Sequence, residues 1–169
     1  PPAYVPVDEE APLWPNSSYA LSKVLGEEMA RQFHRWSGLP SIGLRFSNVI
    51  EPSRYAEFPS FWDDPHKRKW NLWGYVDCRD VAQACRLALT ADIHRADVFI
   101  IAAADTVMNR PSRELMREVF PRVPVREGLG GSTPHPLAPF IRSARSRPRR
   151  ARCGARAEGT RSRACRGRA

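Results

Sequence analysis

A tyrosine and a lysine four residues apart, Tyr19 and Lys23, are the residues of this chain best suited to chemistry. Four residues is just over one helical turn, so in a helix the two side chains share one face. A free tyrosine has a pKa near ~10 and is a weak base at neutral pH. A nearby ammonium group favours the phenolate and lowers that pKa, and a helix N-terminus acts in the same direction. The pair could therefore exchange a proton with a hydroxyl or carbonyl of a substrate, although this spacing also occurs in helices by chance.

A helix must position this pair, and the sequence predicts one from about Tyr19 to Trp36. Asn16, Ser17 and Ser18 can cap its start, and Gly38 with the following Leu-Pro ends it. Apolar residues recur along the helix at spacings of three or four, which makes one stripe: Leu21, Leu25, Met29, Phe33 and Trp36. The stripe could pack on a sheet or form an interface, and the spacing does not separate the two.

Beyond this helix, strand and helix patterns alternate, which predicts an α/β fold with a parallel sheet. The expected strands are Ser41–Ser47, Leu72–Val76, Val98–Ala104 and Val123–Arg126, the third being apolar throughout and so expected to be buried on both faces. Asp77 is expected to cap a helix reaching about Ala91, and Pro111 with Ser112 to open one reaching Phe120. Residues 48–71 are expected to form a long loop, with a short helix as an alternative for part of it.

The surroundings of the pair resemble a known family. The run PLWPNSSYALSKVLGEE, residues 12–28, resembles the catalytic helix of the NAD(P)-dependent epimerase/dehydratase family, the extended short-chain dehydrogenases/reductases. Three later segments agree in type and order. Leu44–Val49 is similar to the family's Leu-Arg-x-x-Asn-Val, Tyr75–Ala82 to its Val-x-x-x-Asp-Val-Ala helix start, and Val98–Ile101 to a later strand. The resemblance implies the C-terminal part of a Rossmann-like doubly wound parallel sheet with a small substrate-binding region.

The resemblance also implies roles for four residues. Tyr19 would be the general acid/base, and Lys23 would lower its pKa and hydrogen-bond the nicotinamide ribose of NAD or NADP. Ser47 would contact the cofactor near the nicotinamide, and Asn48 would contact the substrate. In this family a hydride moves between a substrate carbon and the nicotinamide while the tyrosine moves the proton. The implied activity is that of an epimerase, dehydratase or dehydrogenase.

The sequence departs from the family's pattern in several places. No Gly-x-x-Gly-x-x-Gly or Gly-x-Gly-x-x-Gly run occurs in the 169 residues, and the Ser/Thr that assists the tyrosine in the family is not found. Trp73 stands where many nucleotide-sugar members carry a phosphate-binding arginine, so we expect a sugar or sugar-acid substrate instead. We therefore expect the chain to lack the dinucleotide-binding half and to be inactive alone.

The formal net charge of +9 is confined to one end of the chain. Residues 131–169 hold eleven arginines, no lysine and one acidic residue, whereas residues 1–130 hold 16 basic and 17 acidic groups. Residues 142–169 contain no Val, Ile, Leu, Met, Phe, Trp or Tyr and so cannot build a core. The expected organisation is a partial enzyme domain at 1–130 and an Arg-rich tail at 131–169. The tail is either the product of a shifted reading frame in GC-rich DNA or a genuine disordered segment.

The expected partners are a small sugar-type molecule and a second copy of the chain, bound through the helix at 19–36 as is common in the family. A membrane or a nucleic acid is not expected. No apolar run approaches the ~18 residues of a membrane span, and no signal peptide is evident, so we expect a cytoplasmic protein. The four cysteines show no metal-site spacing. Two other function classes stay open: an Arg-tail nucleic-acid-binding module on a non-catalytic α/β scaffold, and a non-catalytic relative that binds a partner.

Overall fold

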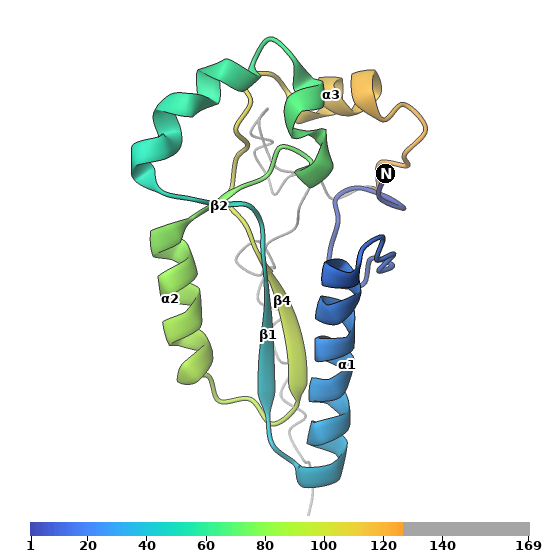
Figure 1. Cartoon of the computed structure of the whole chain (residues 1–169), viewed down its shortest axis with the longest axis vertical. Helices are drawn as coiled ribbons and strands as arrows, with labels where there is room; N and C mark the ends of the chain where they lie inside the picture. Colours follow the sequence, from blue (N-terminus) through green and yellow to red (C-terminus); the bar gives the residue numbers. More distant parts are fainter. Residues whose placement is uncertain (127–169) are drawn as a thin grey trace, which may run out of the picture.

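The structure is a computed structural model that describes residues 1–126, in which helices and strands alternate (Figure 1). The first helix, α1, spans Ser18–Ser37, so the helix predicted from the sequence is confirmed. Ser17 caps its start, since its side-chain oxygen accepts a hydrogen bond from the backbone N–H of Ala20 at 3.1 Å. Gly38 ends it with φ of 74°, a left-handed conformation that glycine adopts without strain.

Two parallel strands lie beside α1. β1 (Ser41–Phe46) pairs with β4 (Ala96–Ile101), with Ser41 opposite Ala96 and Phe46 opposite Ile101. Helix α2 (Cys78–Leu89) lies on the other side of this pair from α1 (Figure 1). The described part is therefore α/β with parallel strands, consistent with part of a Rossmann-like sheet.

Strand β4 differs in two ways from the strand expected at residues 98–104. It begins at Ala96 and ends at Ile101, so residues 102–104 lie beyond it. Ile100 is its one buried residue and the others are half-buried, so the expectation of burial on both faces is wrong for the part of the chain described here. The apolar run is real, but within residues 1–126 the sheet has too few neighbours to cover it.

β1 leads into a second and shorter parallel pair. β2 (Val49–Ile50) pairs with β3 (Val76–Asp77). Between them the chain forms two 3₁₀ helices, η1 (Pro52–Phe61) and η2 (Pro65–Asn71), so the segment predicted as a loop is more regular than expected. Asp77 caps α2 as predicted, accepting a hydrogen bond from the backbone N–H of Arg79 at 2.7 Å.

The strand predicted at Leu72–Val76 is wrong over most of its length. Leu72 and Trp73 have φ of 51° and 57°, in the left-handed region that a strand does not use. The Trp73 side chain is fully buried, and its indole N–H donates to the carbonyl oxygen of Pro65 at 2.8 Å. The apolar residues here fill a core beneath a turn, and Val76 alone of the predicted stretch lies in a strand.

The main buried core lies outside the layer between α1, α2 and the β1–β4 pair. It joins the N-terminal segment, the turn at 72–73, residues 107–108 and helix α3 (Ser112–Val119). Its members are Val5, Leu72, Trp73, Val107, Met108, Leu115 and Met116. In contrast, neither α1 nor α2 contains a buried residue. Within residues 1–126, both long helices are therefore only partly covered.

The last predicted strand, Val123–Arg126, is also wrong as a strand. Val125 forms a single parallel bridge with Val5, and the N–H of Arg126 donates to the carbonyl oxygen of Val5 at 2.8 Å. The predicted domain boundary at residue 130 and the basic tail at 131–169 lie outside the described residues. Within residues 1–126, no helix combines the length and the apolar character needed to cross a bilayer.

Candidate active site

Tyr19 and Lys23 lie on the first turns of α1, as the sequence predicts. The Tyr19 side chain is 71% exposed. The ammonium nitrogen of Lys23 lies 5.0 Å from the centroid of the Tyr19 ring, a distance at which a cation and an aromatic ring attract each other. The helix therefore brings the two side chains together and leaves the tyrosine open to a ligand.

Ser47 and Asn48 follow directly after β1. The backbone N–H of Ser47 donates to the carbonyl oxygen of Ile101 at 3.0 Å, and the carbonyl oxygen of Asn48 accepts from the N–H of Val76 at 2.9 Å. These bonds hold the crossing from the β1–β4 pair to the β2–β3 pair. The hydroxyl of Ser47 is buried and has no hydrogen-bond partner among the described residues. A buried polar atom without a partner is uncommon in proteins, so this hydroxyl is open to a hydrogen bond from a bound group.

The two groups of residues lie at the same end of the β1–β4 pair. β1 runs toward the end of the sheet at which α1 begins (Figure 1). This is the carboxyl end of the parallel strands, where open α/β sheets bind their ligands. Within residues 1–126 no hydrogen bond joins Tyr19 or Lys23 to Ser47 or Asn48. The structure therefore brings each pair together and places both pairs at one end of the sheet.

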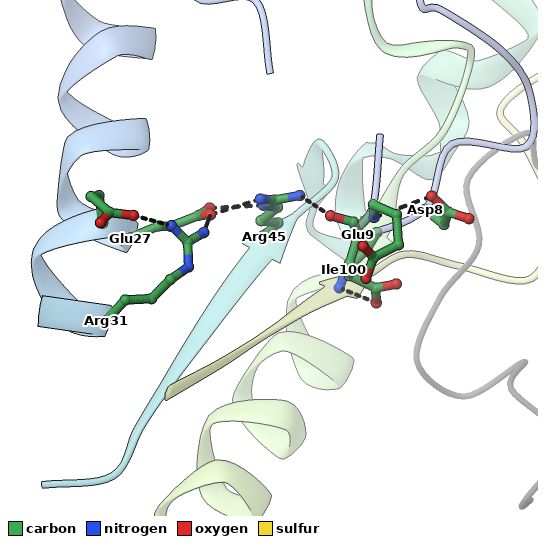
Figure 2. Close-up of polar contacts among 8 residues, drawn as sticks. Asp8, Glu9, Glu27, Arg31, Arg45 and Ile100 are labelled. Carbon is green, nitrogen blue, oxygen red and sulfur yellow. Dashed lines mark hydrogen bonds and ion pairs between the residues drawn. The ribbon is translucent and has the colours of Figure 1, made fainter. Parts of the chain in front are cut away.

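An ion pair that the sequence did not reveal links α1 to β1 (Figure 2). The guanidinium of Arg45 donates to both carboxylate oxygens of Glu27, from Nε at 2.7 Å and from Nη2 at 2.6 Å. The two side chains are only 21% and 16% exposed. The hydrogen bond from Arg45 holds the pKa of Glu27 below its usual value, despite the opposing effect of partial burial. Glu27 comes one turn after Lys23, and that helical spacing was the only signal of it in the sequence.

The N-terminal segment adds a second connection at the same place (Figure 2). The backbone carbonyl of Glu9 accepts a hydrogen bond from Nη1 of Arg45 at 3.4 Å. A carboxylate oxygen of Glu9 also accepts from the backbone N–H of Ile100 in β4 at 3.0 Å. Residues 9, 27, 45 and 100 thus connect four segments of the chain: the N-terminal segment, α1, β1 and β4.

A second polar cluster surrounds Asp77 at the start of α2. The phenol of Tyr55, in η1, donates a hydrogen bond to the Asp77 carboxylate, and the guanidinium of Arg79 donates to both of its oxygens at 2.9 and 2.7 Å. The hydrogen bonds from Arg79 and Tyr55 hold the pKa of Asp77 well below its usual range. The sequence predicted Asp77 as a helix cap but did not indicate its contact with Tyr55. The cluster fixes η1 against the start of α2.

Trp73, which stands where many nucleotide-sugar members carry an arginine, belongs to the buried core. It is therefore not exposed to a ligand. The described residues also contain no group of three or more His, Cys, Asp or Glu side chains placed to hold a metal ion. The groups available for chemistry at the candidate site are thus a phenol, an ammonium, a hydroxyl and an amide.

The residues present fit one part of a nicotinamide cofactor. The unpartnered hydroxyl of Ser47 and the exposed side chains of Tyr19 and Lys23 can meet polar groups of a nicotinamide riboside. The rest of a dinucleotide requires a glycine-rich turn before a helix, and the sequence has no such run. The fit is therefore limited to the reactive end of the cofactor, and the sequence does not contain the glycine-rich motif that holds a diphosphate.

Parallel strands with flanking helices, and a Tyr-x-x-x-Lys pair at the carboxyl end of the strands, make the described part an α/β protein that is consistent with part of a Rossmann-like fold. Residues 2–61 match the sequence model of the family described as GDP-mannose 4,6 dehydratase. Over these residues the chain is similar to the NAD-dependent epimerase/dehydratase family, in agreement with the resemblance of the sequence motifs.

Two curated relatives each match a short part of the chain. The chain is 48% identical over 48 residues to a putative UDP-glucose 4-epimerase of Methanocaldococcus jannaschii, which covers 28% of this chain and 16% of the relative. It is 40% identical over 50 residues to a dTDP-glucose 4,6-dehydratase of Streptomyces niveus, which covers 30% of this chain and 15% of the relative. The matches thus span about a sixth of each relative. No solved structure matches the chain at the same level of significance.

Proposed function

We propose that this chain is the proton-transfer part of an NAD(P)-dependent enzyme that epimerises, dehydrates or oxidises a sugar or sugar acid. The observation that carries the proposal is the contact between Lys23 and the exposed ring of Tyr19, at the end of the sheet where Ser47 and Asn48 lie. The match of residues 2–61 to the family model supports it. The reaction class is inferred from the match to the family, and the role of each residue is inferred from the chemistry of its side chain.

Each of the four side chains has a role in this proposal. Tyr19 takes a proton from, or gives one to, a hydroxyl of the sugar, and Lys23 provides the positive charge beside it. Lys23 also hydrogen-bonds the ribose next to the nicotinamide, and Ser47 contacts the cofactor near the nicotinamide ring. Asn48 donates and accepts hydrogen bonds with the sugar. When bound, NAD or NADP accepts and returns a hydride.

We infer that the chain does not bind the cofactor tightly by itself, because it has no glycine-rich diphosphate motif. Calorimetry with NAD and with NADP tests this directly. We expect no binding at micromolar concentrations, and micromolar affinity would show that the inference is wrong.

The catalytic role is tested with the protein translated from the DNA together with its upstream reading frame. We expect a glycine-rich strand-turn-helix and a Ser/Thr-bearing strand upstream, and micromolar affinity for a nicotinamide cofactor. Replacing the general acid/base, Tyr19→Phe, should lower turnover at least ~100-fold with the cofactor still bound. Lys23→Met, which removes the positive charge beside Tyr19, should also lower turnover, and Lys69→Met, on an exposed lysine of η2, is its control. Turnover that does not depend on Tyr19 would refute the proposal.

We also propose that the chain pairs with a second copy through α1. Its apolar stripe faces away from the sheet, since all five members are exposed, by 46% to 75%: Leu21, Leu25, Met29, Phe33 and Trp36. The residues of α1 that are half-buried lie on a different face, and include Ala20, Val24, Glu27 and Ala30. The same exposed stripe is what a non-catalytic relative that binds a protein partner would use, so that function is the second candidate.

A further inference from the structure

Helix α1 meets the sheet through a face with little apolar area. None of its residues is buried, and the large apolar side chains of the helix lie on the exposed stripe. The face toward the sheet carries small or charged residues, among them Ala20, Val24 and Glu27. Apolar packing, which is non-directional and proportional to area, therefore holds α1 on the sheet only weakly.

Because apolar packing holds α1 only weakly, the directional hydrogen bonds of the Glu27–Arg45 ion pair contribute more to the position of this helix on the sheet. Two parallel N–H···O bonds between a planar guanidinium and a carboxylate fix both distance and orientation, which a single contact does not. Arg45 is itself held in place, because its Nη1 donates to the carbonyl oxygen of Glu9 and it lies inside β1. The Glu27 carboxylate also forms an ion pair with Arg31 of its own helix, with 3.6 Å between Nη2 of Arg31 and Oε2 of Glu27.

The two ends of this ion pair are next to the two halves of the candidate site. Glu27 is one helical turn beyond Lys23 and two turns beyond Tyr19, so the pair controls how α1 is rotated and how far it is displaced along the sheet. Arg45 lies in β1, two residues before Ser47, which follows directly after this strand. A shift of about 1 Å at a catalytic group can cost two orders of magnitude in rate.

We propose that Glu27 and Arg45 are positioning residues that hold the Tyr19–Lys23 pair in a fixed place relative to Ser47 and Asn48. Neither residue touches a reacting atom. The importance of this arrangement for catalysis rests on the proposed function. The position of α1 on the sheet, however, can be measured without cofactor or substrate. The depressed pKa of Glu27 agrees with a carboxylate that stays ionised and paired at neutral pH.

The experiment measures a distance across the sheet in the full 169-residue chain. One spin label is attached to the native Cys85, which is exposed on α2, and the other to α1 through Ser22→Cys, next to Lys23. Cys78→Ser, Cys153→Ser and Cys165→Ser remove the other thiols. Double electron–electron resonance then gives the distribution of distances between the α1 and α2 labels.

We expect Glu27→Gln and Arg45→Lys each to widen this distribution about twofold or to shift its maximum. Glu28→Gln is the matched control, because within residues 1–126 the hydrogen bonds of the Glu28 carboxylate come from Arg31 and Gln32 of the same helix and none comes from the sheet. The exchanged pair, Glu27→Arg with Arg45→Glu, should narrow the distribution again. A role in overall stability alone would change the unfolding midpoint and leave the folded-state distances as they are.

Unchanged distributions in folded Glu27→Gln and Arg45→Lys would overturn the proposal. If circular dichroism shows that the single variants do not fold, the neutral double variant Glu27→Gln with Arg45→Gln replaces them. A wider distribution in that variant supports the proposal, and a native one overturns it. The proposed function is tested separately. Turnover that does not depend on Tyr19 would count against the proposed chemistry, whereas the distances in the ion-pair variants test only the positioning of α1.

Discussion

The phenol of Tyr55 donates a hydrogen bond to the carboxylate of Asp77, which joins the 3₁₀ helix η1 to the first residue before α2. The same carboxylate accepts hydrogen bonds from the side chain and backbone of Arg79. Asp77 is buried, with 7% of its surface exposed. The hydrogen-bonded carboxylate is therefore a point where protonation should loosen two elements at once.

This cluster predicts a pH dependence of stability. The pKa of Asp77 is lower in the folded chain than in the unfolded chain, mainly because Arg79 and then Tyr55 hydrogen-bond its ionised form. Its contribution is therefore present above the unfolded pKa of ~3.9 and is lost as the pH falls below that value. We expect the urea midpoint to fall between pH 7 and pH 3, and to fall less in Asp77→Asn. Asp92→Asn, at a carboxylate with 93% exposure, should keep the full pH dependence.

The phenol itself is tested by Tyr55→Phe. This change leaves the ring contacts with Phe58 and Tyr75 in place and removes one hydrogen bond to the carboxylate. We expect a lower urea midpoint at pH 7 and a smaller decrease of that midpoint on going to pH 3. An identical pH profile in Tyr55→Phe and wild type would contradict the contribution of this hydrogen bond.

Self-association through α1 is tested by placing a charge in the apolar stripe. Met29→Glu puts a carboxylate at the centre of a surface that an α1-mediated dimer would bury, and we expect at least a tenfold weaker association in sedimentation velocity. Leu89→Glu, on a leucine of α2 with 88% exposure, is the control and should leave association unchanged. A wild-type chain that stays monomeric at high concentration would remove the basis for the dimer.

Two glycines of similar surroundings should respond in opposite directions. A Cβ at either Gly26 or Gly38 would meet no atom within 4 Å, so sterics do not separate them. Gly38 has φ of 74°, and Gly38→Ala should cost roughly 1–2 kcal/mol in the free energy of unfolding. Gly26 lies inside α1, and Gly26→Ala should stabilise by roughly 0.5–1 kcal/mol. Chemical unfolding of both variants measures the difference.

The core beside α3 should contribute much more to stability than the surface of α2. Leu115 is fully buried, and Leu115→Ala should lower the free energy of unfolding by about 2–5 kcal/mol through lost burial and a cavity. Leu89→Ala should change it by less than about 0.5 kcal/mol. Similar losses in both variants would mean that the core has been placed wrongly.

The helices could be predicted because their signals are local. Ser17, Gly38, Asp77 and Pro111 each act within a few residues of a helix end, and the structure has helix ends at all four places. The strands at 72–76 and 123–126 could not be predicted correctly, because an apolar run also fits a buried turn or a single bridge. Trp73 shows the difference, since its burial comes with a positive φ.

Only those parts of the candidate site in which residues are neighbours because of their spacing in the sequence could be predicted. Tyr19 and Lys23 are neighbours because a helix turn makes them so. The facing of α1 and the Glu27–Arg45 ion pair depend on contacts between residues 18 positions apart, which periodicity does not encode. The apolar stripe identified one face of the helix correctly but did not reveal that this face points away from the sheet.

The carboxylate of Glu9 has a consequence for how the β1–β4 pair can grow. The bonds of Ser41 and Ser47 show that alternate residues of each strand point toward the partner, so the N–H of Ile100 points outward from β4. Glu9 occupies that N–H with a negative charge, which discourages another strand from adding at this edge. Among the described strands none lies along the outer edge of β1. The two edges of the β1–β4 pair therefore differ: the Glu9 carboxylate opposes the addition of a strand beside β4, whereas the outer edge of β1 is open to a further strand.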